Sequence, residues 1–390
     1  MKAGRSLLAQ VLDFLPMPEF KKCVRRYRGN HKVRKFSCLD QFLSMFIAQL
    51  TGRESLRSIE VSLRSVQSGL YYVGLRGRVS RSTLADANEK RDWRIFADFA
   101  QHLIARAKLL YADQPLVCAE LDAVAYALDS TTIDLCLALF PWAYHQQSKS
   151  AVKLHTLMNL RGNIPEFVHI TGGKTHDVCV LDKIVFEPGA FCIMDRGYLD
   201  FVRLFAITTS AAFFITRAKR NLKARRRYSR EVDGAAGFRS DHTIMLTHGD
   251  SKNAYPHPLR RIRYIDPATE KKLVFLTNNF SLSAANIAAL YKARWQIEAF
   301  FKWIRQNLKI KSFYGTTPNA VKTQIWTAIA AYVLVAIVKK ELKLDASLYT
   351  ILQVLSMSLL EKKQIQSAFS GDDTQNREDR FYNQLTLFAL

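Results

Sequence analysis

Two acidic residues of this sequence lie where apolar, strand-like runs end. Asp129 closes the run AVAYALD, and Asp195 closes the run AFCIMD. The carboxyl ends of strands in α/β sheets carry functional side chains into an open crevice, so two neighbouring strands can bring their carboxylates together. Carboxylate oxygens are the ligands that a hard cation such as Mg²⁺ prefers. Each residue taken alone fits a loop or capping role equally well.

A third acidic residue falls on a helix predicted to begin after Ser283. At about 100° per residue, one stripe of this helix carries four polar residues, Tyr291, Arg294, Glu298 and Arg305. Lys302 continues the same stripe. Apolar residues occupy the adjacent face, so the helix can pack on a sheet with the stripe along its edge. A solvated face, with ion pairs from Glu298 to Arg294 and Lys302, explains the same spacing.

Three carboxylates from two strands and one helix suit two-metal phosphoryl transfer. Metal ions about 3.5–4 Å apart activate the attacking oxygen and stabilise the departing one. Arginines of the stripe are suited to bidentate phosphate binding, and Tyr291 to a hydrogen bond with phosphate or to stacking on a base. The residue types therefore predict one catalytic and metal-binding set: Asp129, Asp195 and Glu298.

The charge balance points to a polyanionic partner. Lysine and arginine number 57 against 34 acidic residues, which gives a formal net charge of +23. Two basic runs, residues 21–35 and 219–231, are the strongest candidates for contact with a DNA backbone. The predicted phosphate-binding residues outside the carboxylate set are Arg25, Arg26, Arg28, Lys153, Arg225, Arg226, Arg227, Tyr291, Arg294, Lys302 and Arg305.

Other classes of protein fit less well. The six cysteines form no CxxC pair and have no paired His/Cys spacing, so neither a zinc site nor a disulfide framework is indicated. Gln10, Asp13 and two prolines interrupt any signal-peptide core near the N-terminus. The most apolar stretch, 325–338, is shorter than the roughly 20 residues of a spanning helix, so we predict a buried helix and no membrane partner.

The hydrophobic patterns divide the chain into five parts. Residues 1–115 have helical patterning and form a basic, DNA-binding region. Strand patterns alternate with helical ones in 116–218 and again in 271–345, which predicts an α/β core in two parts. Residues 219–270 are polar and turn-rich and interrupt that core as a β-rich insertion. Residues 346–390 form a C-terminal helical region and a polar tail.

Three further residues are weaker candidates. His155 alternates with Lys153 in the predicted strand KLHTLMNL, which would turn both toward the carboxylate crevice, although a structural histidine fits as well. His176 and Asp177 follow two glycines in GGKTHD, a turn suited to approach phosphate. In contrast, Asp134 lies at an odd offset from Asp129, on the other face of a continuous strand, and is a poor ligand candidate.

Three motifs together resemble a known family. Asp129 in LDST, Asp195 in MDRGY and the segment YKARWQIEAFFKWIRQNLKIKSFYG are similar to bacterial insertion-sequence transposases of the insertion-sequence-four group. The family hallmark is a DDE triad whose last member lies in Tyr-x2-Arg-x3-Glu-x6-Lys. Tyr291, Arg294 and Glu298 match it in type and spacing, whereas Arg305 stands at the lysine position. A guanidinium fork keeps the charge but not the compact ammonium head.

The resemblance implies a ribonuclease H-like fold that depends on two Mg²⁺ ions, which Mn²⁺ replaces. It also implies binding to terminal inverted repeats of double-stranded DNA, hydrolysis that frees a 3′-OH, and attack of that 3′-OH on target DNA. The expected assembly is a homo-oligomer, at least a dimer, acting on the bacterial nucleoid in the cytoplasm. Two alternatives stay open: a ribonuclease H-like nuclease without strand transfer, and an inactive DNA-binding relative.

Overall fold

A ten-stranded mixed sheet organises the structure, a computed structural model that describes residues 4–116, 123–136, 138–146, 149–308 and 313–369. The strands are β1 (Ala125–Leu135), β2 (Tyr144–Gln146), β3 (Lys149–Asn159), β4 (Ile164–Gly172), β5 (Phe191–Met194), β6 (Phe213–Arg217), β7 (Ala224–Arg230), β8 (Phe238–Leu246), β9 (Leu259–Ile265) and β10 (Lys272–Thr277). They lie in the order β2-β3-β1-β5-β6-β10-β9-β8-β7, and β4 pairs with β3. The fold is therefore mixed α/β, as the sequence predicts.

The centre of the sheet is parallel. β5 lies between β1 and β6 and runs parallel to both, with Leu128 of β1 beside Met194, the last residue of β5. Every residue of β5 is buried, which is typical of a parallel strand covered on both faces. Helix α8 (Phe201–Thr209) connects β5 to β6, and its N-cap Asp200 accepts a hydrogen bond from the backbone N–H of Arg203.

The two sheet faces pack against different helices. On one face, which we call the α12 face, Ala127 and Ile193 join a large cluster with residues of α10 (Ala284–Ala293), α11 (Gln296–Leu308) and α12 (Pro318–Glu341). On the opposite face, the α8 face, Leu128 and Met194 pack with residues of α8. Because side chains alternate along each strand, the parity of a position decides which face it joins.

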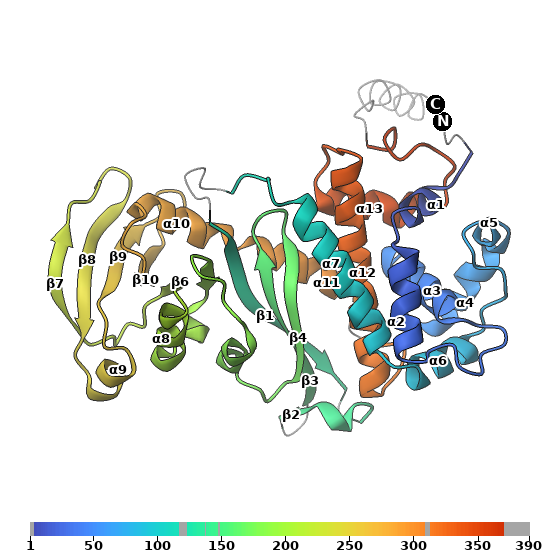
Figure 1. Cartoon of the computed structure of the whole chain (residues 1–390), viewed down its shortest axis with the longest axis horizontal. Coiled ribbons are helices and arrows are strands. Elements are labelled where there is room, and N and C mark those ends of the chain that lie inside the picture. The colour runs from blue at the N-terminus through green and yellow to red at the C-terminus, as the bar shows by residue number, and fades with distance from the viewer. Residues whose placement is uncertain (1–3, 117–122, 137, 147–148, 309–312, 370–390) are drawn as a thin grey trace, which may run out of the picture.

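The predicted insertion extends the same sheet. β9 pairs antiparallel with β10, β8 with β9, and β7 with β8, and α9 (Gly249–Ala254) connects β8 to β9. β7 is therefore the sheet edge, at the end of the molecule farthest from the N-terminal helices (Figure 1).

Seven helices lie within described residues 4–116: α1 (Leu7–Leu12), α2 (Met17–Arg26), α3 (Cys38–Leu50), α4 (Leu56–Ser65), α5 (Gln67–Tyr71), α6 (Arg81–Lys90) and α7 (Arg94–Leu110). Serines fix where several of them begin. Ser37 caps α3 in a reciprocal capping box with Asp40, and Ser6, Ser55 and Ser80 cap α1, α4 and α6.

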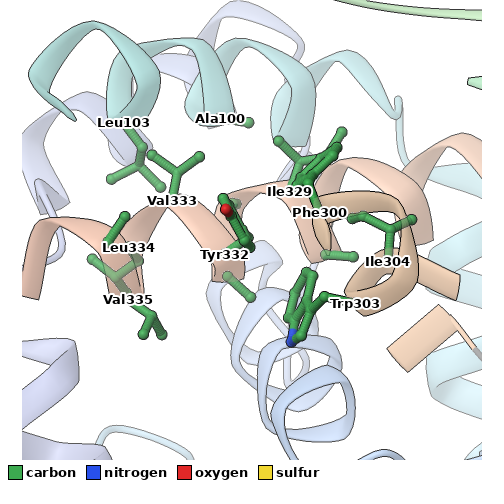
Figure 2. Packing of buried hydrophobic residues seen from close by; sticks show 14 of the residues in the cluster. Ala100, Leu103, Phe300, Trp303, Ile304, Ile329, Tyr332, Val333, Leu334 and Val335 are labelled. Atoms are coloured by element: carbon green, nitrogen blue, oxygen red, sulfur yellow. The ribbon is translucent and has the colours of Figure 1, made fainter. Parts of the chain in front are cut away.

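Helix α12 links the helical region to the sheet. Thr317 caps it and Pro318 occupies its first turn, where the missing N–H costs nothing. Figure 2 shows Tyr332 and Ile329 of α12 beside Phe300 and Trp303 of α11, with α7 on the other side. By length and composition alone α12 could cross a membrane, but 94% of its most apolar window is buried inside the protein. The prediction of a buried helix is confirmed. Helix α13 (Leu348–Ser358) follows, and the predicted polar tail after residue 369 lies outside the described residues.

Candidate active site

Asp129 and Asp195 lie side by side on the α12 face. Asp195 directly follows β5, and the pairing of Leu128 with Met194 puts Asp129 level with it on the neighbouring strand. Both residues have the parity of Ala127 and Ile193, which belong to the cluster of that face. The two strands therefore bring these carboxylates together, as the sequence predicts.

The expected strand end at Asp129 is wrong. β1 continues for six residues to Leu135, because β3 pairs with it along its length and Asp129 lies opposite Thr156. β5 is the strand that ends here. Asp129 therefore lies just beyond the last pair of the parallel β1–β5 ladder but in the middle of the antiparallel β1–β3 ladder.

Arg294 forms an ion pair with Asp129. Its Nη1 lies 2.7 Å from Asp129 Oδ2, and the two side chains are 13% and 22% exposed. Burial raises the pKa of Asp129, as does the neighbouring Asp195, while Arg294 works in the opposite direction. Burial also works to lower the pKa of Arg294, yet the pull of Asp129, Tyr291 and Asp195 raises it. The guanidinium is thus the local counterion of this carboxylate pair.

Tyr291 binds the second carboxylate. Its hydroxyl donates a hydrogen bond to Asp195 Oδ1 at 3.1 Å, and its ring packs against Phe275 at a centroid distance of 5.0 Å. Burial raises the pKa of Tyr291, so its hydroxyl keeps its proton and remains a donor. The two residues of the Tyr-x2-Arg spacing therefore contact one aspartate each.

The predicted single helix is divided. α10 ends at Ala293 and α11 begins at Gln296, although the sequence there has no glycine or proline. Three i→i−3 hydrogen bonds close turns in this segment: Trp295 N to Lys292 O, Ile297 N to Arg294 O, and Glu298 N to Trp295 O. This tighter winding changes the rotation per residue, so Tyr291 and Glu298 do not lie on one continuous α-helix. The expectation of a single helix after Ser283 is therefore wrong.

Glu298 lines a pocket between α11 and α13. The pocket has a volume of about 460 Å³, and Lys302, Arg305 and Tyr349 also line it. Lys302 Nζ lies 5.8 Å from the centre of the Tyr349 ring, and Arg305 Nε donates to the carbonyl of Phe301. Glu298, Lys302 and Arg305 thus line one pocket, while Tyr291 and Arg294 contact Asp195 and Asp129.

The aspartate pair suits a divalent cation. Asp129 and Asp195 place hard oxygen donors side by side, and Thr156 Oγ1, opposite Asp129 on β3, is buried with no hydrogen-bond partner among the described residues. Arg294 Nε is likewise buried with no partner in this part of the chain. Within the described ranges, no three His, Cys, Asp or Glu side chains lie close enough to hold a metal ion. Sequence reasoning missed Thr156, because only the strand register reveals it.

Lys153 and His155 lie on the other sheet face. His155 pairs with Ser130, whose parity is that of Leu128 on the α8 face. Lys153 Nζ lies 3.2 Å from Asp177, and His155 Nε2 lies 2.9 Å from Thr171 Oγ1. The expectation that Lys153 and His155 approach the carboxylate crevice is therefore wrong, because the one-residue offset from Thr156 turns both away.

His155 predicts a specific pH dependence of stability. Its side chain is fully buried, and burial lowers its pKa to about 4. The unfolded state binds a proton near pH 6.5 and the folded state only near pH 4, so stability falls as pH drops through this window, by roughly 3 kcal/mol in total. Urea midpoints at several pH values are expected to show this slope in the wild type and lose it in His155→Gln. An identical slope in both proteins would contradict the assignment.

The N-terminal basic run borders a large pocket. Arg25 and Arg28 line it with Lys21, Lys22 and His31, and its volume is about 1010 Å³. Arg26 points elsewhere, because its Nη1 forms an ion pair with Asp98 at 2.7 Å. Two of the three predicted arginines therefore present their charge at this pocket, and the third is neutralised.

The second basic run forms the edge strand β7. Arg225, Arg226 and Arg227 are all exposed. A β-bulge between Arg226 and Tyr228 shifts the register of β7 against β8. The predicted arginines thus lie on an exposed, cationic sheet edge.

Comparison with known proteins assigns the chain to a family. The sequence profile of the transposase DDE domain matches residues 120–334, more than half of the chain. A domain of unknown function, DUF4372, matches residues 3–76. The first match spans all three predicted acidic residues, and the second covers most of the N-terminal helices.

Similar sequences carry transposase names. The y4zB transposase of Sinorhizobium fredii is 34% identical over 287 residues, which cover 72% of this chain and 78% of the relative. The probable transposase of insertion sequence element IS5377 from Geobacillus stearothermophilus is 30% identical over 53% of this chain and 54% of its own. The transposase of element IS4SA from Synechocystis is 25% identical over 88% and 95%.

Among solved structures, the piggyBac transposase synaptic complex with hairpin DNA is similar to 97% of this chain and 84% of its own, with a TM-score of 0.45 and 12% identity.

Proposed function

The chain belongs to the DDE transposases of insertion sequences, and we propose that it cleaves and joins DNA. We propose Asp129, Asp195 and Glu298 as its catalytic acids. The observation that carries the proposal is the pairing of Asp129 with Asp195, each held by one residue of the Tyr-x2-Arg spacing. This family uses divalent metal ions. We propose Mg²⁺, two ions per site, with Mn²⁺ as a substitute.

The aspartate pair would hold the metal site. When bound, divalent cations stabilise charge on the attacking and leaving oxygens of a phosphoryl group. Asp129 supplies Oδ2 once Arg294 releases it, and Asp195 keeps one oxygen for Tyr291 and offers the other. Thr156 Oγ1 lies next to Asp129 and provides a further oxygen. The chain's own role is to fix these oxygens on rigid strands.

Glu298 is the proposed third acid. Its support is the Tyr-x2-Arg-x3-Glu spacing and the packing of α11 beside β1. The tight winding at residues 294–298 is a joint between α10 and α11 at which a rotation can turn Glu298 toward the aspartates. We propose that DNA binding drives this rotation.

The neighbouring cations are proposed to bind phosphate. Arg294 carries a planar fork of donors, and its ion pair with Asp129 places it beside the aspartates, where it could bind phosphate once Asp129 turns to a metal ion. Tyr291 donates beside it. Lys302 and Arg305 line the pocket of Glu298 on α11, and Arg305 would supply bidentate phosphate contacts where the family pattern has a lysine.

The remaining parts follow the family plan in this proposal. Residues 116–218 and 271–345 form a ribonuclease H-like core, and 219–270 are its β-rich insertion. The helical region 1–115 binds the terminal inverted repeats, with Arg25 and Arg28 at the pocket beside α2. Two or more copies bring two double-stranded ends together with target DNA, on the nucleoid in the bacterial cytoplasm.

A strand-transfer assay tests this function. The protein is incubated with a supercoiled target, Mg²⁺ and either an uncut end duplex, to follow cleavage, or a pre-cleaved end duplex carrying a 3′-OH, to follow joining. We expect joined products that disappear when the 3′-OH is replaced by a dideoxy end. Hydrolysis without joining would instead support a nuclease. If the protein binds the ends but neither cleaves nor joins them, an inactive DNA-binding relative is the better account.

A further inference from the structure

A group of polar and cationic side chains occupies one face of strands β8 and β9. Ser240 and His242 lie two residues apart on β8, and Arg263 and Arg261 lie directly opposite them on β9. Residues opposite each other on paired strands point to the same side. On β7, Arg226 pairs with Ile244, which has the parity of His242. We call these five residues the β8–β9 cationic face.

This face is opposite the one that carries Asp129 and Asp195. Arg261 pairs with Leu276 of β10, and Leu276 belongs to the cluster of the α8 face. Ile244 and Leu259 belong to the same cluster. The cationic face therefore lies on the α8 face of the sheet and borders that apolar cluster. It is far from the N-terminal helices (Figure 1).

Three polar atoms of this face lack hydrogen-bond partners within the described residues. Ser240 Oγ, His242 Nδ1 and Arg261 Nε are all buried without a hydrogen bond. The nearest acid, Asp241, lies on the other side of β8, where Arg260 Nη2 binds it at 2.6 Å and Arg230 lies 3.6 Å away. Its charge is thus already taken up by two arginines.

The cations also repel each other. Burial lowers the pKa of Arg261, and Arg263 lowers it further. Burial likewise lowers the pKa of His242, followed by the charges of Arg261, Arg226 and Arg263. Clustered positive groups with unused donors lose free energy through desolvation and repulsion, and a bound anion recovers it.

We propose that the β8–β9 cationic face binds the phosphate backbone of duplex DNA. This inference rests on the proposed function, since duplex DNA is the polyanion that a transposase meets. The sheet separates this face from the aspartates, so the bound phosphates are not those being cleaved. They belong to a DNA segment that continues around the β7 edge, where Arg225 and Arg227 are also exposed.

Salt-dependent DNA binding tests the proposal with a charge-matched pair of variants. Arg261→Met with Arg263→Gln removes two charges from the face while Met keeps the packed stem. Lys343→Gln with Lys362→Gln removes two exposed charges near the C-terminus, outside the β8–β9 cationic face. Binding to an end duplex is measured by fluorescence anisotropy between roughly 50 and 200 mM salt, a range in which phosphate contacts dominate the salt dependence.

We expect the slope of log K against log salt to fall in magnitude by about 2 for the first variant, close to 0.9 for each lost phosphate contact. The control is expected to keep the wild-type slope. The melting temperature of the first variant should equal or exceed that of the wild type, because an uncompensated cation has been removed. An unchanged slope, or an equal change in the control, would overturn the proposal, as would tighter wild-type binding to a matched RNA duplex.

The strand-transfer assay separates this inference from the proposed function. A wild type that joins ends, together with a first variant whose salt slope is unchanged, would sink the inference alone. If the wild-type protein joins no ends but the first variant shows a smaller salt slope than the wild type, the phosphate-binding face would stand and the transposase mechanism would be rejected.

Discussion

Asp129→Asn and Asp195→Asn are each expected to abolish DNA cleavage, with losses of at least about 10³-fold. Each change removes an anionic oxygen donor from the proposed metal site, and several kcal/mol of charge stabilisation correspond to that factor. Binding to the end duplex should stay within roughly threefold of wild type, because DNA affinity depends mainly on phosphate contacts elsewhere. Cleavage of a labelled end duplex in Mg²⁺ and anisotropy binding are measured on the same preparations.

Asp134→Asn is the matched control. Asp134 lies on the same strand but is exposed on the opposite face, so its loss should leave cleavage unchanged. Equal losses in all three variants would indicate a general effect on β1 and contradict the assignment. Full activity of either Asp129→Asn or Asp195→Asn would contradict it as well.

Arg294→Ala is expected to destabilise the protein and make its stability depend on divalent cations. Removing one partner of a largely buried ion pair leaves Asp129 uncompensated, at a cost of roughly 2–4 kcal/mol. A metal ion bound at the aspartates would replace the missing charge and stabilise the folded state by mass action. We therefore expect Mg²⁺ or Mn²⁺ to raise the melting temperature of this variant more than that of the wild type.

Arg260→Ala supplies the comparison. Arg260 and Asp241 form a pair in which both side chains are only 3% exposed, far from the candidate active site. Its loss should destabilise the protein without any recovery in Mg²⁺ or Mn²⁺. Equal cation responses in the two variants, or none in Arg294→Ala, would show that Asp129 does not bind the metal.

The sequence predicts the aspartate pair well because that pair depends on local patterns. Apolar runs of strand length mark β1 and β5, and the acidic residue that follows β5 is Asp195. The Tyr-x2-Arg spacing then identifies the side chains that contact both acids. Strand parity also explains why Asp134 is exposed on the opposite face.

Features set by tertiary packing are less accessible. Nothing in the helix-favouring sequence around Trp295 marks the break between α10 and α11, because the break is made by hydrogen bonds that shorten from i−4 to i−3. The length of β1 depends on its partner β3, so the polar residues after Leu128 misleadingly resemble a strand end. For the same reason, the sheet face on which Lys153 lies can be predicted only when the pairing of β3 with β1 at Thr156 and Ser130 is known.

The part played by Glu298 decides between a complete DDE triad and an aspartate pair that acts alone. Among the described residues it forms no three-acid group with the aspartates, and the proposed rotation at the α10–α11 joint would bring it to them. A direct test must therefore report metal ligation by each acid in the presence of DNA.

Substitution by cysteine provides that report. A thiolate is a soft ligand that holds Mg²⁺ poorly, whereas Mn²⁺ accepts it better. Cleavage by Asp129→Cys, Asp195→Cys and Glu298→Cys is measured in Mg²⁺ and in Mn²⁺. We predict that all three are inactive in Mg²⁺ and that Mn²⁺ restores cleavage at least about tenfold in each. Activity of Glu298→Cys in Mg²⁺, or the absence of Mn²⁺ rescue in Asp129→Cys and Asp195→Cys, would contradict metal binding by these three acids.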